Sequence, residues 1–269
     1  MRLPDDVVAV LASPQDGVAT RAQLTAAGAD DAWIRRQVLN GRWQRLHQGV
    51  LATYPGPLTW RTRAWGAVLY AGSGAALSHA SAAFRHDFTT VPPRLIDVVV
   101  RDDRRVMPSA GVRIHLRRGG APASGRPRTV WRADTVVDLV AAARSVDDAV
   151  GWVCAASRAG TNLLEVTDAV ARRGTFRNIA LLRTLVAEVS AGIESPLERR
   201  YHHDVERRHG LPRARLQRRE VVAGLWIRPT SAMRGGRRAS SSTATWAIPE
   251  GARTPTPGAT TPSWWPPGS

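Results

Sequence analysis

The chain has 269 residues, a length that suits one large domain or two to three small ones and is sufficient to bury a hydrophobic core. It carries 38 basic and 22 acidic side chains, all of the basic ones arginine, and its formal net charge of +16 favours an anionic partner. The single cysteine, Cys154, excludes an intramolecular disulfide and predicts a reducing compartment.

Neither the N-terminus nor any apolar segment indicates export or membrane insertion. Asp5 and Asp6 stand where a secretory signal requires an apolar core. The longest apolar stretch, residues 64–77, is too short to span a bilayer and contains Gly72 and Gly74. We therefore expect a cytoplasmic protein with no membrane partner.

Residues 1–55 predict a winged helix-turn-helix domain that begins with three short helices. Thr20 caps the second helix, and Gly28 ends it by allowing a positive φ. Ile34 and Val38 are four residues apart, so they share one face of the third helix and pack on the second. The expected helices cover residues 5–11, residues 21–27, and a segment that begins after Asp30 or Asp31 and runs to Asn40.

The segment that follows, residues 42–51, predicts a basic β-hairpin that forms the wing. It contains no acidic residue. In a winged helix the third helix enters the major groove, where arginine pairs with guanine O6 and N7, and the wing neutralises phosphates. Trp33 is ambiguous, because it could contact a base or sugar, but packing is favoured. The predicted DNA-binding residues are Arg35, Arg36, Arg42, Arg45 and His47.

Four short motifs in this zone resemble the winged-helix domain of the AbiEi antitoxin family. They are GVATRAQL at 17–24, IRR at 34–36, GRW at 41–43 and RLHQGV at 45–50. The resemblance covers about one fifth of the chain. It implies a transcriptional regulator that binds duplex DNA in a type IV toxin–antitoxin setting, with a toxin protein as a possible partner.

Residues 56–192 predict a middle domain of mixed helices and strands. The segment SHASAA at 78–83 resembles a recurrent element of the same protein group. Ser78 is a suitable helix cap, and His79 is expected to pack or cap, with a catalytic role as the alternative. No Walker loop, HExxH, CxxC or GxSxG motif occurs, and the seven histidines form no zinc pattern, so we expect no metal and no cofactor. Helices are expected at 60–70, 77–85, 133–143, 147–158, 163–172 and 178–190, and strands at 95–100 and 112–116.

Residues 193–228 open with a capping box, in which Ser195 caps a helix and the side chain of Glu198 reaches back to the backbone amide of Ser195. An apolar stripe of Leu197, Tyr201 and Val205 is expected on this helix, which ends at Gly210 before a basic strand over 213–222. The motifs ESPLE at 194–198 and HGLP at 209–212 resemble the opening of very-short-patch-repair-like endonuclease domains of the PD-(D/E)xK group. That resemblance makes Glu198 a candidate remnant of a catalytic metal site. The alternative is that Glu198 serves only the capping box.

The carboxylates that such a nuclease requires after this helix are missing. A strand Asp and a Glu-x-Asp pair would hold Mg²⁺, the only cofactor that an intact domain would imply. Residues 229–269 contain one acid, Glu250, and seven of the 18 prolines, a composition typical of a disordered tail. The sequence therefore predicts an α+β protein with a winged helix, a mixed middle domain, an incomplete nuclease-like element and a disordered tail.

A change of reading frame near Arg228 accounts for the composition of this tail. In the shifted frame, each codon consists of the last base of one original codon and the first two bases of the next, with G or C chosen at degenerate positions. Residues 229–234 then become T-D-V-R-Y-E, and residues 239–248 become V-E-L-D-G-H-L-G-H-P. Our hypothesis is that a frameshift, genuine or a sequencing error, replaced the nuclease core; an evolved proline-rich tail is the alternative. Resequencing of the gene separates the two, because codon usage that stays in frame leaves no room for a shift.

We expect the chain as written to cleave no DNA. Two of the three carboxylates that would bind the metal are absent, so nothing can polarise the phosphate or activate water. The measurement is a nicking assay on supercoiled plasmid with Mg²⁺ and the purified full chain. Nicking activity that requires Mg²⁺ and copurifies with the protein would contradict the prediction.

Overall fold

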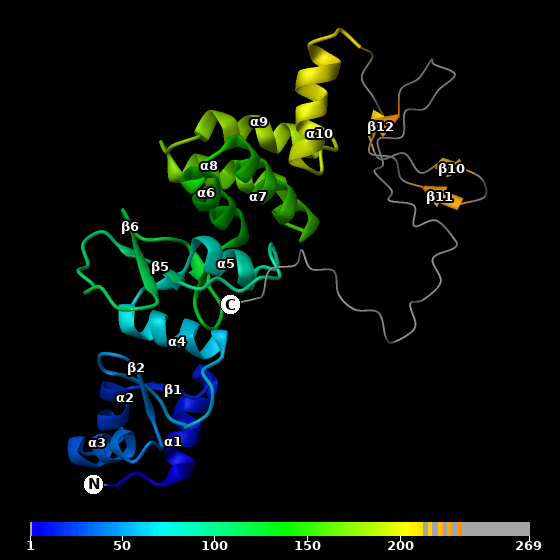
Figure 1. The fold of residues 1–269 in the computed structure, drawn as a ribbon. Coiled ribbons are helices and arrows are strands. Elements are labelled where there is room, and N and C mark those ends of the chain that lie inside the picture. Colours follow the sequence, from blue (N-terminus) through cyan, green and yellow to red (C-terminus); the bar gives the residue numbers. More distant parts are fainter. Residues whose placement is uncertain (1, 212–214, 217–219, 223–224, 228–230, 233–269) are drawn as a thin grey trace, which may run out of the picture. The chain divides into compact units, whose positions relative to one another are not determined.

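The computed structural model of the protein describes residues 2–211 and four short strands beyond them (Figure 1). The chain forms two compact units, residues 1–209 and 210–269. In the second unit β10 (Glu220–Val222) pairs with β11 (Leu225–Ile227), and β12 (Ser231–Ala232) pairs with β9 (Arg215–Leu216), both antiparallel. The rest of the expected strand over 213–222 and of the expected tail over 229–269 lies outside the described residues.

The first unit begins with a three-stranded antiparallel sheet and three helices, in the order of a winged helix-turn-helix (Figure 1). The strands lie in the order β1-β3-β2, so the predicted hairpin is confirmed and a strand ahead of the second helix joins it. The elements are α1 (Asp5–Ala12), the 3₁₀ turn η1 (Ser13–Gln15), β1 (Val18–Thr20), α2 (Arg21–Ala26), α3 (Asp31–Leu39), β2 (Gln44–His47) and β3 (Val50–Ala52).

Two tryptophans form the centre of this N-terminal core. Trp33 of α3 is 5% exposed, and its ring meets that of Trp43 edge to face with 5.2 Å between centroids. Leu24 of α2 and Ile34 of α3 are buried in the same cluster. The packing role expected for Trp33 is therefore confirmed, as is the contact predicted between the second and third helices.

A five-stranded mixed sheet forms the middle of the unit. Its strand order is β6-β5-β4-β8-β7, in which β5 and β6 are parallel, as are β4 and β8. The helices α4 (Trp60–Ala71) and α5 (His79–Arg85) pack against it. The strands are β4 (Ala76–Leu77), β5 (Ile96–Arg101), β6 (Val112–Arg117), β7 (Ala123–Ser124) and β8 (Thr129–Val130).

Helix α4 is buried on two sides. On one side Trp65 packs with Val18 and Val50 of the winged-helix sheet. On the other, alanines and Val68 of α4 pack with Ile96 and other residues of β5. Because side chains alternate along a strand, this contact leaves the opposite face of β5 to Asp97, Val99 and Arg101.

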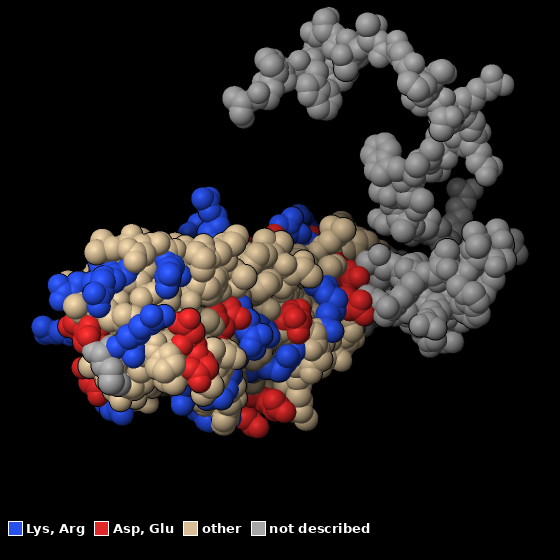
Figure 2. Space-filling model, turned by 90° about the horizontal axis from the view of Figure 1, so that it is seen from below, with Lys and Arg blue, Asp and Glu red and all other residues tan. Residues whose placement is uncertain are grey.

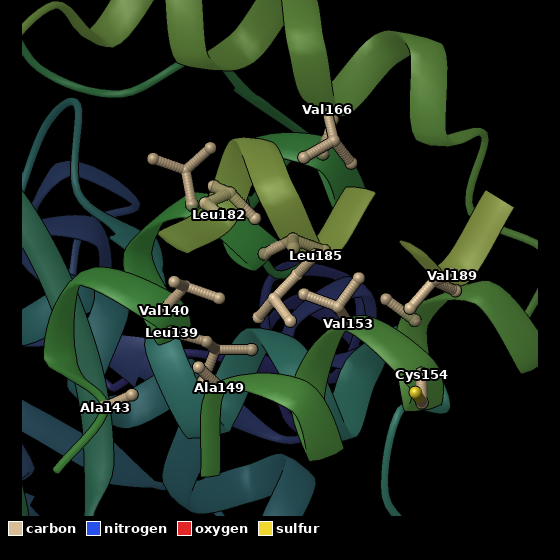
Figure 3. Packing of buried hydrophobic residues seen from close by; sticks show 14 of the residues in the cluster. Leu139, Val140, Ala143, Ala149, Val153, Cys154, Val166, Leu182, Leu185 and Val189 are labelled. Atoms are coloured by element: carbon tan, nitrogen blue, oxygen red, sulfur yellow. The ribbon is translucent and has the colours of Figure 1, made fainter. Parts of the chain in front are cut away.

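Four helices form a layer beyond the sheet: α6 (Arg132–Ala142), α7 (Val146–Arg158), α8 (Leu163–Arg173) and α9 (Ile179–Ser190). Their shared core is aliphatic, and Figure 3 shows Leu182 and Leu185 of α9 converging with Val140 and Val153. Cys154 is buried there, and burial raises the pKa of its thiol to about 11. The predicted helices of this layer are confirmed to within one residue at each end.

The last helix of the unit departs from the sequence prediction. It begins as α10 (Pro196–Arg200) and continues as a π-helix, η2 (Tyr201–Arg207). Leu197 is 73% exposed, so the predicted apolar stripe is wrong. The packed face of α10 is the one that carries Glu198 rather than Leu197, and beyond Tyr201 the wider turn no longer keeps residues four apart on one line. The side chains buried along it are Glu198 and Glu206.

The start of α5 also differs from the prediction. Leu77 belongs to β4, and the helix begins only at His79. Ser78 occupies the cap position, but its hydroxyl makes no cap bond and lies 3.1 Å from Nδ1 of His79. The short strands β1, β4, β7 and β8 were not predicted, because two or three residues show no alternation. No helix of the described part combines the length and apolarity needed to cross a membrane.

The partly buried position of His79 makes the fold sensitive to acid. Burial, with help from the neighbouring His115, lowers the pKa of His79 from 6.5 to about 4. The unfolded chain therefore takes up its proton first as the pH falls, and the free energy of unfolding should drop by about 2 kcal/mol between about pH 7 and pH 5. Burial also lowers the pKa values of His47 and His86, which act in the same direction. Urea unfolding at a series of pH values measures the drop.

A pair of variants isolates the contribution of His79. His79→Gln removes the titrating group, so the pH dependence should become flatter, whereas His209→Gln at an exposed position should leave it unchanged. An identical pH dependence in the wild type and in His79→Gln would contradict the assignment.

Candidate nucleic-acid interface

Two helix caps fix the residues at which α2 and α3 begin. The backbone N–H of Gln23 donates to Oγ1 of Thr20 at 3.1 Å, and the N–H of Thr20 donates to Oε1 of Gln23 at 2.8 Å. Asp30, rather than Asp31, caps α3, because its Oδ1 accepts from the N–H of Trp33 at 2.6 Å. These bonds satisfy donors that a helix leaves free at its start, so the third helix begins at a defined residue.

The solvent face of α3 carries the two predicted base-reading arginines. Trp33 and Ile34 point into the core, and Arg35 and Arg36 are exposed on the opposite side. Leu39, one turn on from Arg35, is 82% exposed. Guanidinium groups suit guanine and an aliphatic side chain suits the thymine methyl, so this face has the chemistry that the major groove requires.

A hollow of about 510 Å³ lies between α3 and the β2–β3 hairpin. Three arginines line it: Arg35 from α3, Arg45 from the hairpin and Arg21 from the start of α2. Figure 2 views this end of the unit, where arginines and acidic side chains are interspersed rather than segregated. Arg21 is paired with an acid, because Oδ1 of Asp31 accepts from its Nε at 2.7 Å.

Arg21 was missed by sequence reasoning. Its place in the hollow depends on a long-range contact, because its backbone N–H donates to the carbonyl of Gly49 in the hairpin turn at 2.8 Å. That bond joins the start of α2 to the tip of the wing. The sequence carries no local signal for it.

The remaining predicted residues lie in three places. Arg36 and Arg42 are exposed but do not line the hollow. His47 is half-buried and faces the middle of the unit, where its Nδ1 lies 2.8 Å from Oγ of Ser109 and its ring contacts Tyr70. Burial lowers the pKa of His47, which opposes the charge that a phosphate contact needs. The structure thus brings Arg35 and Arg45 together and separates His47 from them.

Glu198 serves the cap of its own helix. Its Oε2 accepts from the N–H of Glu194 at 2.7 Å, and Oγ of Ser195 accepts from the N–H of Glu198 at 3.2 Å. The carboxylate therefore reaches one residue further back than a standard capping box. Within the described ranges, no group of three or more His, Cys, Asp or Glu side chains is placed to hold a metal ion.

No protein-family model matches the sequence, and no curated protein matches it either. Among solved structures, the chain is similar to the RV2827C protein from Mycobacterium tuberculosis, with 18% sequence identity and a TM-score of 0.49. The match covers 72% of this chain and 79% of that chain. Neither a fold nor a function is transferred at that level of similarity.

The cap at Thr20 should contribute measurably to the stability of the helix-turn-helix. Thr20→Ala removes the hydroxyl acceptor and should lower the free energy of unfolding by about 1 kcal/mol. Thr25→Ala, at an exposed position in the same helix, is the matched control and should cost nothing. Urea unfolding of the three proteins measures the difference, and equal stabilities would refute the role of the cap.

Proposed function

We propose that this protein binds duplex DNA through α3 and the β2–β3 hairpin and acts as a transcriptional regulator. The observation that carries the proposal is the arginine-lined hollow between the two elements, beside a recognition helix that exposes Arg35 and Arg36. A helix and a hairpin that flank one basic hollow can contact a groove and the adjacent backbone together.

The two elements divide the work of recognition. Arg35 and Arg36 project from the solvent face of α3, where a guanidinium group can pair with guanine O6 and N7. Arg42 and Arg45 are exposed on and before the hairpin, where they neutralise phosphates and set the register without reading the sequence. Arg21 adds a charge to the hollow, which its pairing with Asp31 partly offsets.

The regulated genes are a further part of the proposal. The sequence resemblance to AbiEi antitoxins supports a toxin–antitoxin operon, in which the chain would repress its own promoter and a toxin protein would be its partner. An adjacent toxin gene supports this extension, and an orphan locus counts against it.

A gel-shift titration of the full chain against its own promoter tests DNA binding. Arg35→Ala and Arg36→Ala should each weaken binding by about 1–3 kcal/mol where the side chain pairs with guanine. Arg183→Ala, at an exposed position on α9, removes the same charge far from α3 and should leave binding unchanged. If both α3 substitutions leave operator affinity unaltered, α3 is not the reading helix.

The hairpin should contribute affinity without specificity. Arg45→Ala should weaken binding to operator and to unrelated duplex by the same factor, and it should reduce the slope of log affinity against log salt by about one. Titrations at several salt concentrations measure the slope. A loss confined to the operator would show that Arg45 reads bases instead.

A further inference from the structure

A second basic hollow, of about 520 Å³, lies in the middle of the first unit, away from α3. Arg117 at the end of β6 and the adjacent Arg118 line one side of it. Arg172 and Arg173, from the last turn of α8, line the other. We call it the arginine hollow.

One buried carboxylate holds two of these arginines in place. Asp134 of α6 is 1% exposed in its side chain, and both of its oxygens are engaged. Oδ1 accepts from Nη2 of Arg117 at 3.0 Å, and Oδ2 accepts from Nη2 of Arg172 at 2.9 Å. Because the carboxylate is buried and doubly bonded, the two guanidinium groups are pre-positioned rather than free to sample many rotamers.

The charges in the hollow do not balance. Asp138, one turn further along α6, is the second carboxylate, and its oxygen lies 3.8 Å from Arg117 and 3.7 Å from Arg173. These separations are too long for hydrogen bonds. Burial raises the pKa of Asp138, which weakens its ability to compensate the arginines. Four guanidinium groups thus face two carboxylates.

Arg117 carries a buried N–H that makes no hydrogen bond within the described residues. Its side chain is 9% exposed, and its Nη1 has no hydrogen-bond partner in the described part of the chain. A buried N–H of a charged group without a partner is costly to the folded state. The nearest acceptor belongs to Asp138, whose Oδ2 is buried and likewise makes no hydrogen bond in that part of the chain, so an incoming anion would meet the exposed guanidinium groups of Arg118 and Arg172 first.

We propose that the arginine hollow binds the phosphate group of a small phosphomonoester. A phosphate dianion matches the excess of two positive charges, and its oxygens match the planar donor fork of arginine. The exposed Thr175 adds a hydroxyl at the rim, and Leu116, which is 61% exposed, provides an apolar wall for the organic part. The volume suits a small ligand.

This site is independent of the DNA interface, since it shares no residue with the hollow beside α3. It would give the regulator an effector. The simpler explanation, that Arg172 and Arg173 serve only the dipole at the end of α8 and the charge of Asp134, predicts no ligand. Binding experiments without DNA separate the two.

The test is calorimetric titration of the purified full chain with inorganic phosphate, in a phosphate-free buffer at constant ionic strength. We expect saturable binding at one site with a dissociation constant of about 1 mM or tighter, and no binding of acetate. Arg118→Ala and Arg172→Ala should each weaken phosphate binding about tenfold through the loss of a charge-assisted contact. Arg183→Ala should bind as the wild type does.

Two further arms make the outcome decisive. Arg118 is exposed and makes no ion pair in the described ranges, so its variant keeps the fold even if Arg172→Ala does not. A nucleoside monophosphate should displace phosphate, and a blunt DNA duplex should not. Absence of saturable phosphate binding, equal weakening in Arg183→Ala, or displacement by the duplex would each overturn the proposal.

Discussion

The packing of α4 between two sheets is the constraint on which the first unit depends. The helix contacts the winged-helix sheet through Trp65 and the mixed sheet through small side chains. Gly66 permits the close approach, because a Cβ at that position would lie 2.8 Å from a methyl of Leu46. A helix enclosed in this way cannot tilt without opening one core or the other. The N-terminal three-stranded sheet and the middle of the unit are therefore parts of one packed body.

The same geometry decides how the charge of the protein is distributed. Ile96, Val98 and Val100 of β5 face α4, so Asp97, Val99 and Arg101 lie on the opposite face, against which α5 packs. The face turned toward α5 also holds Arg117, which meets the buried Asp134. This face therefore combines a small apolar cluster of Ala76, Val99 and Val130 with buried charged groups. Buried ion pairs of this kind contribute little net stability. Their presence is therefore better accounted for by the ligand site that we propose.

The two basic hollows differ in how deeply their arginines are buried, and this difference matches the ligand proposed for each. The hollow beside α3 is rimmed by exposed arginines, which suits a polyanion whose counterions are released into water. The arginine hollow contains a nine-tenths buried guanidinium and a fully engaged carboxylate, which suits a small dianion that can be desolvated. Charge alone would not distinguish them. Burial and the fixed orientation of the donors do.

The sequence by itself determined the local structure. Cap residues such as Thr20 and Ser195 and the spacing of apolar side chains located most of the helices, because these signals act within one or two turns. The exposure of Arg35 and Arg36 also follows from that spacing. The excess of arginine was also visible in the sequence, but the sequence did not indicate which arginines lie together in the folded protein.

Only the tertiary structure decided which side chains meet. Arg21 reached the first hollow through a bond to Gly49, and Arg172 reached Asp134 across 38 positions of the chain. His47 turned inward to Ser109, and α10 buried Glu198 in place of Leu197. The physical reason is common to Arg21, Arg172 and His47. The position of a side chain on its own element is set by neighbours in the sequence, whereas its partner is set by the packing of elements that are distant along the chain.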